Sequence, residues 1–196
     1  MEEDYSKITE LNFYNKEIDE LPDLSRYINL KKLNCSINNL TSLDNLPQTL
    51  EYLDCRNNKI TSLDNLPIGL KNLICDRCPT KFLDNLPQGL EFLQCRQNGL
   101  KTLDNLPNGL KTLICDNNFL THLDNLPKGL EYLSCRDNGI VTLDNLPSTL
   151  KTLDCYNNLI SELPNLPHNL QKIECRENPI ERYFVMNVEN IRSLYL

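Results

Sequence analysis

The chain has 196 residues, a formal net charge of −7 at pH 7 and an isoelectric point near 4.9. This length is enough for one domain with a sizeable core, and no apolar run approaches the roughly 20 residues that span a bilayer. Nucleic-acid binding needs a basic face, which an acidic chain lacks. We therefore expect neither a nucleic acid nor a membrane among its partners.

The chain begins with the acidic and polar stretch MEEDYSKITE at residues 1–10. A secretory signal would begin with positive charge and an apolar stretch, so the sequence predicts no export. We therefore expect an intracellular, cytoplasmic protein, with the cytoplasm of a host cell as one such compartment. The single Asn-x-Thr sequon, at Asn39, is then a chance match.

A regular repeat makes up most of the chain. The string L-x-x-L-x-C-x-x-N-x-(L/I) starts at Leu30 and recurs every 20 residues through Leu170, after a degenerate 22-residue copy that starts at Ile8. Each copy is called a coil, the degenerate copy is coil 1, and positions count from the first residue of a coil. We predict a single domain over 1–196, with an N-terminal cap and degenerate first repeat in 1–29, eight repeats in 30–180 and a C-terminal cap in 181–196.

Each coil predicts one short strand and a return segment without a long helix. The first half alternates apolar and polar residues, as in LKTLIC at 110–115, which is strand periodicity with one buried face. The second half, as in TSLDNLP at 61–67, carries a fixed Pro and should be extended or polyproline-like. Leu at positions 1, 4, 11, 14 and 17 then fills the interior beside a parallel sheet.

Position 9 holds Asn, whose amide at a tight bend can satisfy backbone groups of its own coil and of the next coil. These residues are Asn38, Asn58, Asn98, Asn118, Asn138, Asn158 and Asn178. Coil 4 departs from the pattern, because it has Cys78 at position 9 and Thr80 at position 11, where the other coils have Leu or Ile.

The pattern resembles the leucine-rich-repeat family, in particular its short class with 20-residue repeats found in bacterial secreted effectors. The chain has Cys where those repeats often have Val, and similar Cys-bearing repeats occur in large DNA viruses. The resemblance covers about residues 8–180. It implies a right-handed α/β solenoid with a curved parallel sheet whose concave face binds partners, and it carries over no catalytic residue.

The last sixteen residues, 181–196, do not belong to the repeat. Phe184, Val188, Ile191 and Tyr195 recur at helical spacing, so we predict a short amphipathic helix that caps the last coil. A contact between two copies of the chain is the alternative role for this segment.

Nine cysteines are present, and eight of them occupy position 6, where the alternation points side chains inward. These are Cys35, Cys55, Cys75, Cys95, Cys115, Cys135, Cys155 and Cys175. Side chains stacked in register on parallel strands point alongside one another, so we predict plain packing rather than disulfides. Cys75 and Cys78 form a C-x-x-C pair, for which a metal or redox role is the alternative to packing.

The outward positions of the strands carry a 40-residue alternation. At position 2 Lys alternates with Glu from Lys31 to Lys151, and at position 7 Arg alternates with Asp from Arg56 to Arg136. Opposite charges then face each other on neighbouring strands and fix the register.

Positions 3 and 5 place apolar side chains on the same open face. We predict a concave stripe that binds a protein partner, with three arginines beside it, since aromatic and Arg side chains are common at interfaces. Cross-strand packing on an open sheet is the alternative. The stripe comprises Tyr52, Ile74, Phe92, Ile114 and Tyr132, and the arginines are Arg56, Arg96 and Arg136.

The return segments carry one Asp per coil at position 15, from Asp44 to Asp144, and Gly in four coils at position 20. Turn capping is the favoured role of the Asp row, with Ca²⁺ binding and an acidic partner surface as alternatives. The glycines, Gly69 among them, suggest a bend with positive φ.

The two histidines, His122 and His168, fall at unrelated positions, and no phosphate-binding loop or metal-ligand set is present. We therefore expect a non-catalytic interaction module with a protein partner and without cofactor or metal. A structural, self-assembling protein, a homo-oligomer joined through solenoid edges or ends, is the alternative.

Overall fold

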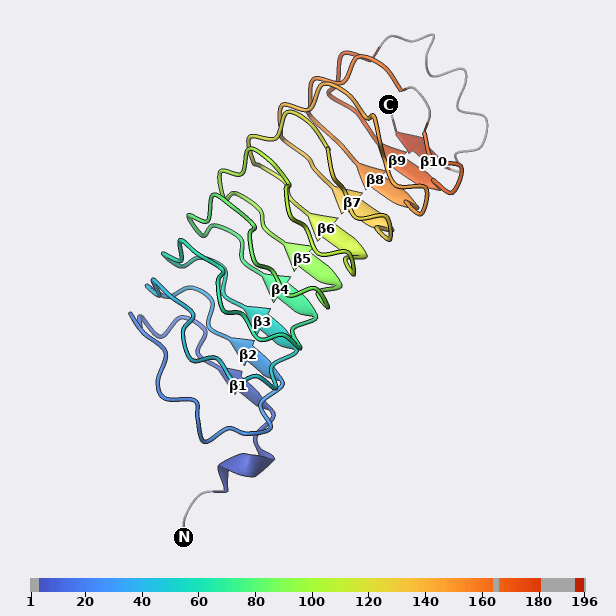
Figure 1. The fold of residues 1–196 in the computed structure, drawn as a ribbon. Helices are drawn as coiled ribbons and strands as arrows, with labels where there is room; N and C mark the ends of the chain where they lie inside the picture. The colour runs from blue at the N-terminus through green and yellow to red at the C-terminus, as the bar shows by residue number, and fades with distance from the viewer. Residues whose placement is uncertain (1–3, 164–165, 181–192, 196) are drawn as a thin grey trace.

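The computed structural model describes residues 4–163, 166–180 and 193–195. In these residues ten short strands stack side by side, in chain order, into one parallel sheet (Figure 1). A short 3-10 helix, η1 (Tyr5–Lys7), precedes the first strand. The strands are β1 (Glu10–Asn12), β2 (Lys32–Asn34), β3 (Tyr52–Asp54), β4 (Asn72–Ile74), β5 (Phe92–Gln94), β6 (Thr112–Ile114), β7 (Tyr132–Ser134), β8 (Thr152–Asp154), β9 (Lys172–Glu174) and β10 (Ser193–Tyr195).

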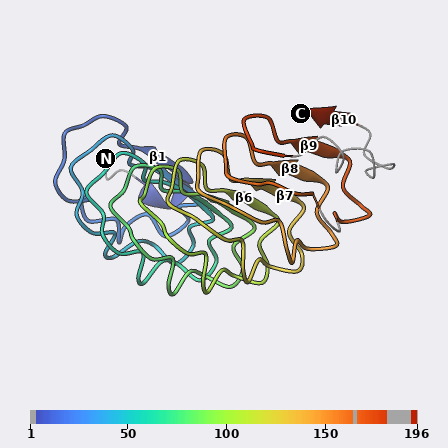
Figure 2. The ribbon, with the colours of Figure 1, turned by 90° about the horizontal axis from the view of Figure 1, so that it is seen from above.

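The stack is curved, with the strands along the inner side of the arc and the return segments along its outer side (Figure 2). The described return segments contain no helix and carry turns at the Asp-Asn pair and after the Pro. The second turn is closed by a backbone hydrogen bond from position 1, as from Leu50 N to Pro47 O at 3.1 Å. The predicted curved solenoid with a concave parallel sheet is therefore confirmed.

Equal positions of neighbouring coils stand opposite each other in the sheet. Tyr52 pairs with Asn72 and Leu53 with Leu73, and this register continues through the 20-residue coils without a slip. The constant repeat length causes this stacking, since every coil returns to the same place. Leu at positions 1 and 4 and Cys at position 6 are almost completely buried throughout, whereas Leu at position 17 is only partly buried in several coils.

The Asn at position 9 ties neighbouring coils together through their backbones. The Asn118 side-chain amide donates to the carbonyl oxygens of Cys95 at 3.0 Å and Cys115 at 2.9 Å. Its oxygen accepts the backbone N–H groups of Asn98 and Leu100, both at 3.0 Å. The predicted role is confirmed, but the neighbour it serves is the preceding coil and not the next one.

The position-6 cysteines point into the interior, as predicted, and all nine cysteines of the chain are buried. In several coils, a single backbone carbonyl of the following strand accepts hydrogen bonds from both the backbone N–H and the thiol of the position-6 cysteine. Ser134 O, for example, accepts Cys115 N at 2.8 Å and Cys115 Sγ at 3.3 Å. Burial disfavours the thiolate, and it raises the pKa of Cys35 to about 12.

Coil 4 keeps the fold with different side chains. The Cys78 thiol donates to Cys55 O of the preceding coil at 3.4 Å, as the position-9 amide does in the other coils. Thr80 is completely buried where other coils have Leu or Ile. Its hydroxyl is the one buried side-chain polar atom without a hydrogen-bond partner in the described part of the chain.

The suggested positive φ at the position-20 glycines is wrong. Positive φ occurs instead at positions 8 and 16, mostly at Asn, as at Asn57 (53°) and Asn65 (61°). Close packing between coils requires glycine only at Gly109, since a Cβ on any of the other three would make ordinary van der Waals contacts. A Cβ on Gly109 would lie 2.9 Å from the carbonyl oxygen of Gln88, too close for any side chain.

The C-terminal helix that we predicted over 181–196 is not confirmed. Residues 181–192 and 196, with Phe184, Val188 and Ile191, lie outside the described residues. A helix that reaches Tyr195 is wrong, because Ser193–Tyr195 form β10 and pair in parallel with β9. Pairing satisfies the backbone groups that the edge of β9 would otherwise leave exposed.

We predict that Asn118→Ala lowers the free energy of unfolding by about 2–4 kcal/mol, because several buried backbone groups lose their hydrogen-bond partner. Urea denaturation measures the change. Asn108→Ala is the matched control, since Asn108 is exposed in a return segment, and it should change stability by less than about 0.5 kcal/mol. Equal effects of the two substitutions would contradict a ladder that holds the coils together.

We also predict that the native protein resists thiol labelling. A buried thiol with a raised pKa exposes little thiolate to a reagent. Ellman's reagent should therefore react rapidly with no more than one or two of the nine thiols in the native state, and with all nine after urea denaturation. Rapid reaction of several thiols in the native protein would show that the ladder is not buried.

Candidate interaction surface on the concave sheet

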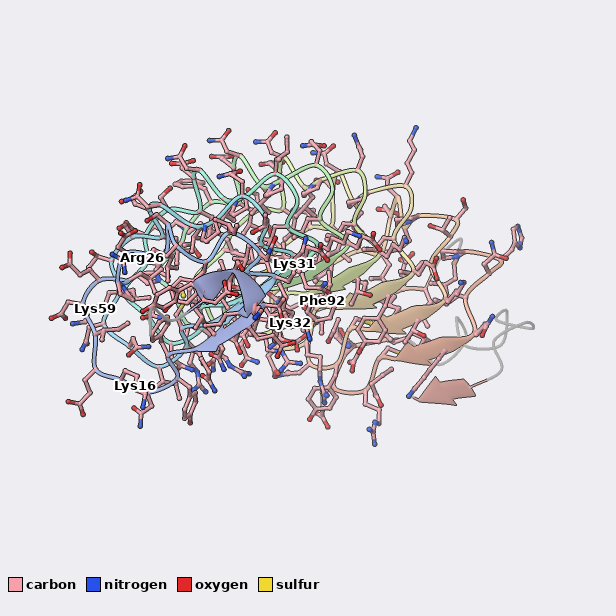
Figure 3. The ribbon with its side chains drawn as sticks, turned by 90° about the horizontal axis from the view of Figure 1, so that it is seen from below. Lys16, Arg26, Lys31, Lys32, Lys59 and Phe92 are labelled. Carbon is pink, nitrogen blue, oxygen red and sulfur yellow. The ribbon has the colours of Figure 1, made fainter. Side chains whose placement is uncertain are left out.

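The open face of the sheet carries two adjacent rows of side chains from positions 3 and 5. The register places the row Tyr52, Asn72, Phe92, Thr112 and Tyr132 beside the row Asp54, Ile74, Gln94, Ile114 and Ser134. The five members of the predicted stripe therefore alternate between the rows on successive strands, from β3 to β7. Figure 3 labels Phe92 beside the strands.

All five stripe residues are half-buried, and none is fully exposed. Their neighbours on the sheet cover part of each side chain, and the remainder faces the concave side. Two other members of the position-5 row are buried, since Asp54 and Ser134 are 2% and 3% exposed. The structure thus gathers the stripe on one face with polar groups buried between its members.

The three predicted arginines flank this stripe and pair with buried or half-buried carboxylates. Arg56 contacts Asp54 at 2.9 Å, Arg96 contacts Asp116 at 2.9 Å, and Arg136 approaches Asp154 at 3.6 Å. Of the predicted position-7 pairs, only Arg96–Asp116 forms. Arg56 and Arg136 use position-5 carboxylates instead, because these lie within reach on the same face.

These carboxylates also bind the sheet itself. Asp116 Oδ1 accepts the Ser134 hydroxyl at 2.5 Å and the Arg136 backbone N–H at 3.0 Å. Asp54 Oδ1 accepts the Arg56 backbone N–H at 3.3 Å. Burial raises the pKa of Asp54, and the nearby Arg56 opposes that rise.

The position-2 charges form ion pairs across neighbouring strands, as predicted. Lys31 pairs with Glu51 at 2.7 Å, Lys111 with Glu91 at 3.1 Å and Lys151 with Glu131 at 2.5 Å. Their side chains are roughly half exposed, so each pair contributes at most about 1 kcal/mol. They border the stripe with charge and favour the observed register.

Sequence reasoning missed a hollow at the rim where strands β1 to β5 end. It has a volume of about 360 Å³ and includes Tyr14, Ile37, Arg56, Arg77 and Arg96 in its lining. Arg77 lies at position 8, where the seven other coils of the regular repeat carry apolar, amide or acidic side chains. The occurrence of one basic residue in an otherwise non-basic row was the sequence signal that could have identified the hollow.

The Asp row of the return side makes hydrogen bonds between coils. Asp64 and Asp84 accept the side-chain amides of Asn85 and Asn105, at 2.8 and 2.9 Å. Within the described ranges, no three His, Cys, Asp or Glu side chains converge in a way that could hold a metal ion. The hydrogen bonds that this row accepts come from side chains and not from backbone N–H groups of the same turn, so the predicted turn capping is not confirmed in the described residues.

The histidines lie in return segments, away from the stripe. His122 shares a hydrogen bond with the neighbouring Thr121 hydroxyl at 2.9 Å, and His168 lies two coils further along. None of the helical residues that the structure describes forms a segment long and apolar enough to cross a bilayer.

Comparison with known proteins identifies the repeat. The family described as leucine-rich repeats in two copies matches residues 128–168. The 20-residue coils are therefore leucine-rich repeats of the short class, as their sequence predicted. Among curated proteins, none matches this sequence.

Solved structures of bacterial proteins share the fold. YopM from Yersinia enterocolitica is 33% identical over 83% of this chain, with a TM-score of 0.73. The functional domain of InlJ from Listeria monocytogenes, which includes a cysteine ladder, is 28% identical over 90% of this chain, with a TM-score of 0.70. This chain spans 41% of the YopM chain and 46% of the InlJ chain, less than half of either.

A third structure, the leucine-rich-repeat domain of a Shigella effector, is 24% identical over 97% of this chain and 82% of its own, with a TM-score of 0.69. At this identity the likeness concerns the fold alone. All three neighbours are bacterial proteins.

We predict that two aspartates titrate on opposite sides of the ordinary value of 3.8. The pKa of Asp54 lies above it because of burial, and the pKa of exposed Asp64 lies below it because Ser62 and Asn85 donate to the carboxylate. Just above 3.8 the folded protein then binds more protons at Asp54 than the unfolded chain does, so this group's contribution to stability falls as the pH rises through that window. Carboxyl ¹³C NMR titration measures both values, and an Asp54 midpoint at or below that of Asp64 would refute the assignment.

Proposed function

We propose that this leucine-rich-repeat solenoid is a non-catalytic module that binds a protein partner on its concave sheet. The stripe supplies the apolar contacts and the three adjacent arginines supply the polar ones. The proposed contact residues are Tyr52, Ile74, Phe92, Ile114 and Tyr132, with Arg56, Arg96 and Arg136.

The observation that carries this proposal is the gathering of the stripe on one open face. Strand register brings two tyrosines, a phenylalanine and two isoleucines from five coils together between the Lys–Glu pairs and the arginines. Apolar and aromatic groups at the centre, with charge at the border, are the usual composition of a binding surface.

The stiffness of the support favours binding as well. Each stripe residue is half-buried by its neighbours, and each of the strands β3 to β7 is paired on both sides. A partner would therefore meet side chains that have already lost much of their rotational freedom, which reduces the entropy lost on association.

An intracellular, cytoplasmic site of action is part of the proposal. Nine buried thiols suit a reducing compartment, where cysteines persist without forming disulfides.

Self-assembly is the second candidate function, and a separate surface supports it. Phe119 and Leu159 lie at position 10 of alternate coils, outside the sheet, and are 68% and 58% exposed. Analytical ultracentrifugation distinguishes the two functions, since self-assembly through this surface makes the apparent mass rise with concentration and depend on Phe119.

We predict that the variant Ile74→Glu/Phe92→Glu/Ile114→Glu loses a partner that the wild-type protein retains. Three carboxylates placed in the stripe oppose burial of this face, because an unpaired charge is costly to desolvate. The measurement is a pull-down from bacterial and eukaryotic lysates, with bound proteins identified by mass spectrometry and folding checked by thermal unfolding.

The matched control is Ile68→Glu/Phe82→Glu/Val141→Glu, which places the same three carboxylates at exposed apolar residues outside the sheet and outside the Phe119 surface. A milder stripe variant with Thr at the same three positions introduces no charge, places β-branched side chains that suit strands, and serves if the Glu variant unfolds. A partner lost by the folded stripe variant and kept by the control supports the proposal. A partner kept by every folded stripe variant contradicts it.

A further inference from the structure

We propose that the hollow at the rim of the sheet, between Arg56, Arg77 and Arg96, is a socket for an acidic side chain of the bound protein. The inference rests on the proposed function and adds the chemistry of one contact, a carboxylate from Asp or Glu. The hollow lies where strands β1 to β5 end, and its three arginines follow β3, β4 and β5, beside the stripe residues of the same coils.

Arg77 is the centre of the socket. Its side chain is exposed, and it donates to two neutral amide oxygens, Gln97 Oε1 and Asn57 Oδ1, the latter at 3.5 Å. No carboxylate within ion-pair distance of Arg77 is found in the described residues. Its charge is therefore held in place by neighbours that do not neutralise it, which leaves guanidinium donors for an incoming anion.

The backbone conformation at position 8, which all regular coils share, directs the Arg77 side chain toward the hollow. Position 8 has positive φ in every regular coil, for example 56° at Ile37, 52° at Arg77 and 56° at Gln97. Side chains at this position therefore leave the chain at the same bend and form a row along the rim. Neighbouring coils are about 4.8 Å apart, and Arg56 and Arg96 directly precede the position-8 residues of the two coils beside Arg77 and line the same hollow, so one carboxylate can reach Arg77 and one of these arginines.

Arg56 and Arg96 flank the hollow with their carboxylates behind them. The side chains of Asp54 and Asp116 are 2% and 6% exposed, whereas those of Arg56 and Arg96 are 42% and 43% exposed. The negative ends of both pairs are thus buried in the sheet and the positive ends face the hollow. A layer of this kind attracts an anion at contact distance, although the pairs are neutral overall.

Asp76 is the one carboxylate that lines the hollow, and it is committed to the sheet. It is 9% exposed, with one oxygen accepting the Arg96 backbone N–H at 2.7 Å and the other the Gln94 amide at 2.5 Å. These bonds direct the carboxylate inward, so it does not compete for the outward guanidinium donors.

The remaining wall suits the aliphatic part of an acidic residue. Tyr14 and Ile37 are 49% and 38% exposed and line the same hollow. An apolar wall beside guanidinium groups accommodates the methylene groups of Glu or Asp while the carboxylate meets the arginines. Bidentate pairing of Arg with a carboxylate supplies the directional part of the contact.

The experiment is an NMR titration of the wild-type protein with hexaglutamate at 0.15 M salt, observing the arginine side-chain Nε–Hε signals. We expect saturable shifts at Arg56, Arg77 and Arg96, and no comparable shift at Arg176, whose guanidinium is already bidentate to Glu174. Hexaglutamine should leave all of these signals in place. Arg77→Gln should weaken hexaglutamate binding about tenfold, because it removes a charged hydrogen-bond donor.

Lys101→Gln is the matched control, since it removes one positive charge from an exposed residue of a return segment and should leave the affinity unchanged. Equal weakening by both variants, or shifts spread over all arginines, would show general attraction and overturn the socket. Absence of any saturable shift would overturn it as well. The stripe variants test the proposed function separately, so a failed titration leaves their result standing.

Discussion

The hydrogen bonds of the position-9 Asn are the interaction on which the rest of the structure depends. One side chain satisfies backbone groups of two coils, as Asn118 does for Cys95, Cys115, Asn98 and Leu100. These groups lie in a bend that the strand ladder cannot serve, and an unpaired backbone group in the interior is costly. A coil of constant length with Asn at a constant place therefore stacks only in register, with equal positions against each other.

Register converts a period in the sequence into rows on a surface. Because neighbouring coils place the same position side by side, a residue type repeated every 20 residues would put like charges about 4.8 Å apart. The 40-residue alternation avoids this, since Lys31 meets Glu51 and Arg96 meets Asp116. The same alternation places Ile74 and Phe92 in different rows. The 40-residue alternation that avoids like-charge contacts therefore also determines the arrangement of the apolar stripe.

The 20-residue period predicted the features that follow from strand register. It could not predict which ion pairs form, because these depend on how far each side chain reaches. The strands, the buried cysteines and the placement of Tyr52 to Tyr132 on one face follow from alternation and coil length. Arg56 and Arg136 form ion pairs with carboxylates at position 5, and the spacing of the repeat does not specify these partners. A search for repeated features did not find Arg77, because Arg occurs at position 8 in only one coil. The strand β10 was not predicted because its residues lie outside the repeat.

The charged groups of the concave sheet have a further consequence for binding. Asp54 and Asp116 have already been desolvated by folding, and their arginines and backbone donors hold them in place. The unfavourable rise in the pKa of Asp54 is the sign of that desolvation. A partner that covers this face therefore removes little additional water from the carboxylates and meets mainly half-buried apolar groups and guanidinium donors. The face is more receptive to apolar and acidic surface than the acidity of the whole chain suggests, because its own acidic groups lie beneath it.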